Sequence, residues 1–468
     1  MVIFTVSGVR GVYGYDLTLE RCIDIALAYG STLPPGSTVA LGRDSRPTGV
    51  AISKCIASAL ASTGCRVLDL GVAATPMMAY VVRMLKLDGA IIVSASHNPP
   101  EWNALKFLGS CGIPLNYQAI ISLYENVSNR RFRFMEPLSI GYIRRVDLED
   151  LYLHGLLDLV DRDIIADGRL EVVVDGGGGA GGILSSKALS TASCKVLSVS
   201  SIGGFYPRGI EPTPENLKKT ADLVGEVGAD VGFAYDCDAD RVTLITDGGE
   251  VLREDYTLAL TITHILSKRR VDTVVVNVAT SMVIDDIASS YGVKVLRVPV
   301  GEANVVEAML KTGAEVGGEG SCGGVILSWF NMVRDGLAST MNIVEMIASR
   351  KEALSDIVRD LPRYYLSRDR IDCPQSIADK VMEEFKRMVE GMDVDYIDGV
   401  RITFRDGWVL VRLSGTEPII RVMCESRSKI EAERLCRDYS DRIRRLIRET
   451  LDRYNYYPGI EYERGRSR

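Results

Sequence analysis

Short runs of β-branched and other apolar residues alternate with longer segments in which apolar positions recur every three or four residues. A short apolar run is typical of a buried strand, whereas the longer spacing is typical of a helix with one buried face. The N-terminal part predicts strands at 38–41, 66–70 and 89–94, separated by helices at 49–62 and 76–85. Strands and helices in this order indicate βαβ units on a parallel or mixed sheet.

The same alternation recurs twice further along the chain. Helical stretches again separate the apolar runs, so each recurrence predicts another α/β block. The second block has expected strands at 170–175, 195–199 and 230–234, and the third has them at 273–278, 294–298 and 315–317.

The C-terminal region follows a different pattern. A helix, an antiparallel meander with tight polar turns, and a second helix are expected there. These are a helix at 377–392, strands at 399–404, 408–413 and 421–425, and a helix at 428–446. The expected fold is α/β: three consecutive similar α/β domains with mixed sheets, plus a C-terminal α+β domain, around a central cleft. The expected domains are 1–150, 151–248, 249–365 and 366–468.

Composition narrows the class of protein. The chain has 468 residues, of which 46% are hydrophobic and 25% charged, as in soluble globular proteins. Its net charge of −7 and the lack of a basic patch predict no nucleic-acid partner. No apolar run approaches the ~18 residues of a membrane span, and no signal peptide is recognisable, so no membrane partner and a cytoplasmic location are expected. The ten cysteines include no C-x-x-C pair, which predicts neither a zinc site nor a disulfide framework, although odd pairings stay open.

A polar segment, SASHNPPEWNALK at 94–106, directly follows a predicted strand. Ligands gather at the carboxyl ends of strands in α/β sheets, so a serine such as Ser96 is well placed there. It could accept a phosphoryl group if a base took its proton and cations offset the charge. His97 and Lys106 are the nearby candidates for the base. The alternative is an ordinary strand-to-helix loop whose polar side chains satisfy backbone groups.

Three aspartates, Asp236, Asp238 and Asp240, stand at alternate positions between two apolar runs. Such carboxylates repel one another unless a cation neutralises them, and a hard divalent metal such as Mg²⁺ does so with oxygen ligands. A calcium loop of the EF-hand type would need Gly and Glu where this chain has Arg241 and Asp247. A solvated acidic turn is the remaining alternative.

Two further segments are suited to a sugar and to a phosphate. In GGEGSCGG at 317–324, glycines permit close approach of the backbone to a ligand, and Glu319 could bind paired sugar hydroxyls. In RLSGTEPIIR at 412–421, hydroxyls and backbone N–H groups between two arginines could cradle a phosphate. The alternatives are a common glycine-rich turn and a hairpin turn with paired surface arginines.

Taken together, in this order and spacing, the four segments resemble the α-D-phosphohexomutase family of phosphoglucomutases, phosphomannomutases and phosphoglucosamine mutases. The resemblance covers nearly the whole chain. It extends to SGVRG at 7–11, GRDSRP at 42–47, Thr75-Pro76 and Arg334-Asp335-Gly336. One position departs from the pattern: Gly323 stands where many bacterial members have a His.

The resemblance implies a role for each matching residue. Ser96 would carry the phosphate and touch a Mg²⁺ ion held by the three aspartates, with Arg10 and Lys106 nearby and Lys106 as the preferred proton carrier. Three groups of residues are implied to bind the substrate: Arg241 beside the metal, Glu319 and Ser321 at the sugar hydroxyls, and Arg412, Ser414, Gly415, Thr416 and Arg421 around the phosphate that does not react.

The implied activity is that of a phosphohexomutase, an isomerase that moves phosphate between the 1- and 6-positions of glucosamine, mannose or glucose phosphates. The reaction would pass through a phosphoserine and a bisphosphosugar, with a hexose 1,6-bisphosphate as activator. The expected partners are small-molecule sugar phosphates, and the expected state is a monomer or homodimer. The alternatives are a phosphatase that forms a phosphoserine and a sugar-phosphate-binding regulator without catalysis.

Overall fold

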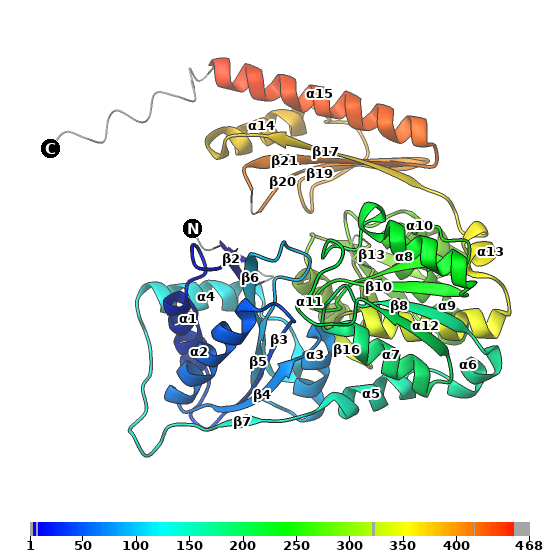
Figure 1. The fold of residues 1–468 in the computed structure, drawn as a ribbon. Helices are drawn as coiled ribbons and strands as arrows, with labels where there is room; N and C mark the ends of the chain where they lie inside the picture. Colours follow the sequence, from blue (N-terminus) through cyan, green and yellow to red (C-terminus); the bar gives the residue numbers. More distant parts are fainter. Residues whose placement is uncertain (1–2, 6–7, 321–322, 416, 454–468) are drawn as a thin grey trace. The chain divides into compact units, whose positions relative to one another are not determined.

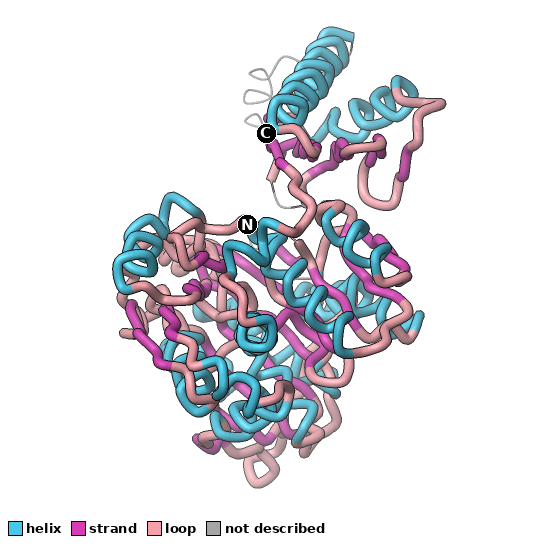
Figure 2. The backbone as a smooth tube through the Cα atoms, turned by 90° about the vertical axis from the view of Figure 1, so that its right-hand side faces the viewer, coloured by secondary structure: helices cyan, strands magenta, loops and turns pink. Residues whose placement is uncertain are grey.

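The computed structural model describes residues 3–5, 8–320, 323–415 and 417–453. The chain forms two compact units: unit 1 consists of Met1–Thr280 and Ile284–Leu361, and unit 2 of Ser281–Val283 and Pro362–Arg468. Unit 1 contains three sheets, whose strands lie between helices (Figures 1 and 2), and unit 2 contains one. None of the described helices is both long enough and apolar enough to cross a lipid bilayer.

The first sheet has seven strands in the order β1-β2-β6-β5-β3-β4-β7. Strands β3, β4, β5 and β7 are parallel, whereas β6 pairs antiparallel with β5, β2 antiparallel with β6, and β1 antiparallel with β2. The strands are β1 (Ile3–Thr5), β2 (Gly8–Val12), β3 (Thr38–Arg43), β4 (Arg66–Val72), β5 (Gly89–Val93), β6 (Trp102–Leu108) and β7 (Ile143–Arg145). The helices are α1 (Leu19–Thr32), α2 (Thr48–Ser62), α3 (Thr75–Met84) and α4 (Tyr117–Ser128), with a 3₁₀ turn, η1 (Ser110–Gly112).

The second sheet, in the order β11-β10-β8-β9, has one antiparallel strand beside three parallel ones. Its apolar strands β8 and β10 are almost wholly buried, as expected of a sheet covered on both faces. The strands are β8 (Glu171–Asp175), β9 (Lys195–Val199), β10 (Val231–Tyr235) and β11 (Val242–Thr246). The helices are α5 (Glu149–Asp158), α6 (Arg162–Gly168), α7 (Gly181–Thr191) and α8 (Pro214–Val227).

The third sheet, in the order β13-β12-β14-β15-β16, is also mixed. Strands β13, β12 and β14 are parallel, and β15 and β16 continue the sheet antiparallel. The strands are β12 (Thr273–Asn277), β13 (Lys294–Val298), β14 (Val316–Gly318), β15 (Val325–Leu327) and β16 (Asn331–Asp335). The helices are α9 (Glu254–Lys268), α10 (Val283–Ser290), α11 (Glu302–Thr312), α12 (Gly336–Arg350) and α13 (Leu354–Arg359).

Unit 2 has a fully antiparallel sheet in the order β17-β21-β20-β19-β18. Helices α14 and α15 cover one of its faces (Figure 1), and their apolar sides share a core with the sheet. The strands are β17 (Tyr365–Asp372), β18 (Val394–Asp395), β19 (Val400–Phe404), β20 (Gly407–Leu413) and β21 (Ile419–Ser426). The helices are α14 (Gln375–Met388) and α15 (Lys429–Arg453).

The predicted fold class is confirmed: three consecutive α/β blocks with mixed sheets precede an α+β block. Two differences concern strands. The segment after Ser96 was expected to stay a loop up to Lys106, but Trp102–Leu108 forms β6 beside β5. In unit 2, a further strand, β17, precedes the predicted helix and pairs with β21.

Candidate active site

Ser96 lies in the loop that joins β5 to β6, and only 2% of it is exposed. Its backbone φ of +51° falls in the left-handed region, which a residue with a side chain adopts only when its surroundings hold it there. The loop therefore presents this serine in one fixed conformation.

Arg46, whose side chain is wholly buried, holds that loop. Its guanidinium donates to the backbone carbonyl oxygens of Ser96 (2.8 Å) and Asn98 (2.6 Å), and also to those of Pro99 and Trp102. The carboxylate of Asp44 accepts from Arg46 Nε at 3.0 Å and neutralises it. A single buried cation thus binds four backbone carbonyls between Ser96 and Trp102.

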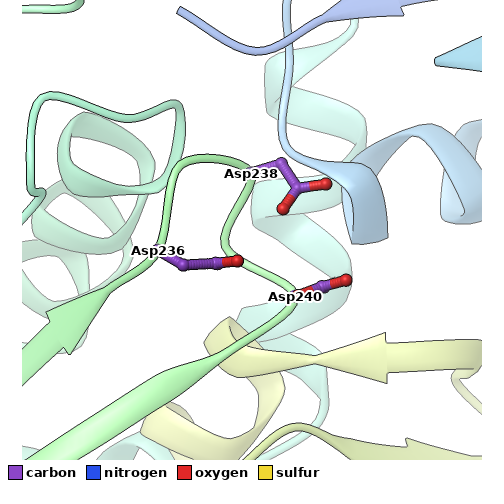
Figure 3. Close-up of side chains that lie close together, drawn as sticks. All are labelled: Asp236, Asp238 and Asp240. Carbon is purple, nitrogen blue, oxygen red and sulfur yellow. The ribbon is translucent and has the colours of Figure 1, made fainter. Parts of the chain in front are cut away.

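The three aspartates lie in the loop between β10 and β11, and each is 0% exposed. Their side chains extend to the same side of the loop (Figure 3). One oxygen from each of Asp236, Asp238 and Asp240 lies within 4.8 Å of the others, which suits a single metal ion. Because the carboxylates are buried, the alternative of a solvated acidic turn is wrong.

The donor set fits a hard divalent cation. Among the described residues, Asp238 Oδ1 and Asp240 Oδ1 are buried and accept no hydrogen bond. A buried carboxylate oxygen without a partner is costly unless a cation binds it. Carboxylate oxygens are the ligands that Mg²⁺ prefers.

The serine loop and the aspartate loop meet in the structure. Ser96 Oγ donates a hydrogen bond to Asp236 Oδ2 at 2.6 Å, although the two residues are 140 positions apart. Thr75, at the start of α3, donates its hydroxyl to Asp238 Oδ2. The first two α/β blocks thus bring the candidate nucleophile to the candidate metal ligands.

Lys106 reaches the same carboxylates from β6. Its Nζ lies 2.6 Å from Asp238 Oδ2 and 3.2 Å from Asp240 Oδ2. Burial lowers the pKa of Lys106, but the carboxylates of Asp238 and Asp240 outweigh burial and raise the pKa above its ordinary value. The side chain therefore carries a full positive charge beside the aspartates.

The carboxylates differ in their electrostatic surroundings. Burial and the charges of Asp240 and Asp238 raise the pKa of Asp236 well above its usual range. Burial also acts to raise the pKa of Asp240, but Arg334, Lys106 and Arg241 outweigh it, so this pKa is lowered. The cations of the site thus gather around Asp240, whereas Asp236 faces the serine.

The remaining predicted catalytic residues surround the serine loop. Arg10 Nη1 donates to Asn98 Oδ1 at 2.9 Å, and His97 Nδ1 lies 3.4 Å from Ser96 Oγ. Burial, with the positive charges of Arg241 and Arg10, lowers the pKa of His97 to about 2, so its ring is neutral near pH 7. Arg241 Nε lies 3.8 Å from Asp240 Oδ1.

Glu319, in the glycine-rich loop after β14, is linked to the aspartates through Arg334. Arg334 Nη1 lies 3.1 Å from Glu319 Oε2, and its Nη2 lies 2.7 Å from Asp240 Oδ2. Asn277 Nδ2 also donates to Glu319, at 2.8 Å. The predicted sugar contact is therefore tied by one arginine to the metal loop; Ser321 lies outside the described residues.

The position that departs from the family pattern, Gly323, has a steric explanation. Its φ is +71°, and a Cβ there would lie 2.4 Å from the carbonyl oxygen of Val242. No side chain fits at 323 without a shift of backbone, so a histidine is excluded at this point of the loop.

In unit 2, the predicted phosphate-binding residues occupy the turn between β20 and β21 and the strands beside it. Arg412 Nε lies 3.2 Å from Asp398 Oδ2, and Arg421 Nη2 lies 3.1 Å from Glu417 Oε2. Ser414 Oγ accepts from the backbone N–H of Glu417 at 3.3 Å, and a Cβ on Gly415 would meet open space. Thr416 lies outside the described residues.

Three residues that matched family motifs have roles in the structure that were not predicted from the sequence. These are Arg46, which holds the serine loop, Thr75, which contacts Asp238, and Arg334, which joins Asp240 to Glu319. Arg46 and Arg334 lie in short motifs that contain Gly and Asp, which was the available signal, but most of their partners lie far away in the sequence.

Comparisons with known proteins identify the family of the chain. Sequence models of the four domains of the phosphoglucomutase/phosphomannomutase family match residues 1–134, 150–249, 253–365 and 373–441. A phosphoglucomutase/phosphomannomutase of Thermococcus kodakarensis is 36% identical over 458 residues, which cover 96% of this chain and 99% of that protein. A probable phosphoglucosamine mutase of Methanopyrus kandleri is also 36% identical, over 96% of this chain and 99% of that protein.

Solved structures of other proteins have the same fold. A phosphoglucomutase/phosphomannomutase family protein from Burkholderia thailandensis superposes with a TM-score of 0.82 at 25% identity, over 98% of each chain. The N-acetylphosphoglucosamine mutase of Aspergillus fumigatus shares the fold, with a TM-score of 0.60 at 13% identity over 95% of this chain and 96% of that one. With the relatives matching it over nearly its full length, the chain belongs to the phosphoglucomutase/phosphomannomutase family and is a hexose-phosphate mutase, an isomerase.

Proposed function

We propose that this mutase interconverts hexose 1-phosphates and hexose 6-phosphates through a phosphate carried on Ser96. The observation that carries the proposal is the 2.6 Å hydrogen bond from Ser96 Oγ to Asp236, a member of the buried aspartate cluster. A nucleophilic oxygen beside a site for a divalent cation is the arrangement that phosphoryl transfer requires.

The proposed reaction has two transfers. The 6-hydroxyl oxygen of a hexose 1-phosphate attacks the phosphorus on Ser96; the bond from phosphorus to Ser96 Oγ breaks, and the hydroxyl proton passes to a base. The resulting 1,6-bisphosphate turns end for end. Ser96 Oγ then attacks the phosphorus at position 1; that phosphorus–oxygen bond breaks, and the sugar oxygen takes up a proton. Hexose 6-phosphate leaves, and phosphorylated Ser96 is restored.

Side chains of the protein bind or offset the negative charges of the two phosphates. We propose that Asp236, Asp238 and Asp240 bind Mg²⁺ together with the phosphate on Ser96. When bound, Mg²⁺ polarises the transferring phosphoryl group as a Lewis acid. Arg10 and Arg241 offset the charge of the second phosphate, since each phosphate ester carries about −1.5 to −2 at pH 7. Support for magnesium includes the Aspergillus fumigatus relative, solved with GlcNAc-6P and magnesium.

Lys106 is the proposed proton carrier: its charged Nζ gives a proton to the oxygen that leaves phosphorus, and the neutral amine so formed takes the proton of the attacking hydroxyl. Its Nζ lies against Asp238, in the same carboxylate cluster that Ser96 contacts, so it is near the oxygens that gain and lose protons. His97 is a second polar group beside Ser96 Oγ, and we propose that its neutral ring orients that oxygen.

The sugar and the distal phosphate have separate proposed binding groups. Glu319 and Ser321 would bind sugar hydroxyls, and the turn of unit 2 with Arg412, Ser414, Gly415, Thr416 and Arg421 would bind the phosphate that does not react. The names of the relatives support glucose, mannose and glucosamine phosphates as the candidate substrates.

The activator is a separate proposal. Glucose 1,6-bisphosphate, which an Aspergillus fumigatus relative binds, is the proposed activator. We place the activity in the cytoplasm, in a monomer or homodimer.

The test is a rate panel. Purified protein with Mg²⁺ and a trace of glucose 1,6-bisphosphate is given each of the three hexose 1-phosphates, and formation of the 6-phosphate is followed. Ser96→Ala is expected to lower the rate at least about 10³-fold, because it removes the nucleophile. Ser110→Ala, which changes an exposed serine of the same domain, is the matched control. EDTA is expected to abolish the activity, and added Mg²⁺ to restore it.

Each contrary outcome has a definite meaning. Release of free phosphate without isomerisation would indicate a phosphatase, and binding of sugar phosphate without turnover would indicate a regulator. Full activity of Ser96→Ala would exclude the phosphoserine mechanism altogether.

A further inference from the structure

Three arginines stand side by side across the sheet of unit 2. Arg421 on β21 is paired in register with Arg370 on β17 and with Arg412 on β20. Directly paired residues of neighbouring strands project from the same face of a sheet. Like charges in this arrangement repel one another, so the row is stable only with anions beside it.

Two carboxylates offset part of the charge of the three arginines. Glu417 is shared: Arg370 Nη2 lies 2.5 Å from its Oε1, and Arg421 Nη2 lies 3.1 Å from its Oε2. Arg412 is paired with Asp398 at 3.2 Å. The side chain of Arg370 is 64% exposed and those of Glu417 and Arg421 are 40% exposed, so solvent and ligands reach this cluster.

We infer that Arg370 is a third arginine of the phosphate-binding turn, and that Glu417 accepts the hydrogen bonds of Arg370 and Arg421 when no phosphate is bound. The inference rests on the proposed function, in which this turn binds the phosphate that does not react. A phosphate dianion offers three acceptor oxygens and more charge than one carboxylate. It therefore satisfies the arginine row better than Glu417 does.

A purely structural role for Arg370 is the competing explanation. In that case the Arg370–Glu417 pair would only fix the turn after β20, and loss of either partner would have the same effect. If instead phosphate replaces Glu417, loss of the carboxylate removes a competitor, whereas loss of the arginine removes a ligand. The two explanations thus predict opposite results for Glu417→Gln.

The experiment compares Arg370→Ala, Glu417→Gln and Arg368→Ala in the mutase assay, with thermal midpoints measured in parallel. Arg368 is the matched control, because it is exposed on the same strand and pairs with Met423 rather than with an arginine. For Arg370→Ala we expect KM for the hexose 1-phosphate to rise about tenfold with kcat nearly unchanged, since a charge-assisted hydrogen bond to substrate is lost. Arg368→Ala is expected to leave both constants near their wild-type values.

Glu417→Gln completes the test. We expect its KM to equal or fall below that of the wild type. A rise in KM as large as that of Arg370→Ala would overturn the inference in favour of the structural role, and equal KM values for Arg370→Ala and Arg368→Ala would also overturn it. Failure of the wild type to isomerise any of the sugars would be a failure of the proposed function instead, so the two are distinguishable.

Discussion

At the residue scale, the site depends on a buried arginine, Arg334, whose role was not predicted from the sequence. Arg334 contacts Asp240 at 2.7 Å and Glu319 at 3.1 Å, and its side chain is 11% exposed. Loss of Arg334 removes one cation from two buried carboxylates, which is far more costly than loss of a surface pair. Arg334 thus positions the proposed sugar contact, Glu319, and a proposed metal ligand, Asp240, at once.

Arg334→Gln is therefore expected to damage both stability and substrate binding. The free energy of unfolding should fall by about 3–5 kcal/mol, as for other broken buried pairs. KM should rise, because Glu319 loses the group that orients it, and Arg334→Lys should restore part of this loss. Denaturant unfolding and steady-state kinetics measure the two effects.

A surface pair of the same domain supplies the control for Arg334. Arg269 and Glu315 are 3.5 Å apart, with side chains 45% and 39% exposed. Arg269→Gln should change the free energy of unfolding by no more than about 1 kcal/mol. Equal effects of the two substitutions would show that Arg334 is an ordinary surface-like charge and not a positioning residue.

The sequence was sufficient to predict site residues that form a motif within a few neighbouring positions. Asp236, Asp238 and Asp240 form a pattern within five positions, and the structure brings them together as one buried cluster. It was insufficient for Arg46 and Arg334, whose partners come from other segments of the chain. A lone arginine carries no local sign of the carbonyl or carboxylate that it will meet in the fold.

At the scale of elements, strands with a clear apolar pattern were predictable and strands with a mixed pattern were not. The apolar run of β10 is wholly buried and matches its prediction. In β17, the sequence YLSRDRID has three consecutive charged residues and a single buried position, Ile371, at a sheet edge, so it resembles a linker in the sequence. The strand β6 was missed because Pro99 and Pro100 precede it and the polar residues Asn103 and Lys106 interrupt its apolar pattern.

Helix α12 is held to its neighbours by a buried carboxylate, Glu345. Its oxygens accept from His264 Nε2 on α9 at 2.7 Å and from the backbone N–H of Asp161, at the start of α6, at 2.9 Å; Lys268 on α9 also contacts it. Burial acts to raise the pKa of Glu345, but the hydrogen bonds from His264, Lys268 and Asp161 outweigh burial and lower the pKa to about 2. Three helices thus depend on one ionised group.

This pKa predicts a pH dependence of stability. A carboxylate whose pKa is lowered by folding stabilises the protein above its unfolded pKa, and that stabilisation is lost as pH falls toward the folded value. The contribution of Glu345 should therefore be complete above pH 4.5 and decline toward pH 2. The wild type should exceed Glu345→Gln in free energy of unfolding near neutral pH, and the difference should shrink as the pH falls from 4.5. A difference that stays constant with pH would contradict this account.

At the scale of the whole molecule, the chain contains separate hydrophobic cores in its two units. The core of unit 2 includes Phe385, which is 0% exposed and packs with residues of α14, α15 and the antiparallel sheet. A core of unit 1 includes Phe107, 4% exposed, among residues of the first sheet and its helices. Units with cores of their own can unfold as separate cooperative blocks.

Calorimetry of two matched variants tests this division. Phe385→Ala and Phe107→Ala each leave a cavity that should cost about 3–5 kcal/mol in the unit that contains it. We expect Phe385→Ala to lower the midpoint of one thermal transition and Phe107→Ala to lower another, because no residue is common to the two cores. If both substitutions shifted one shared transition equally, the chain would unfold as a single block. The turn proposed to bind phosphate would then unfold together with unit 1 and not separately from it.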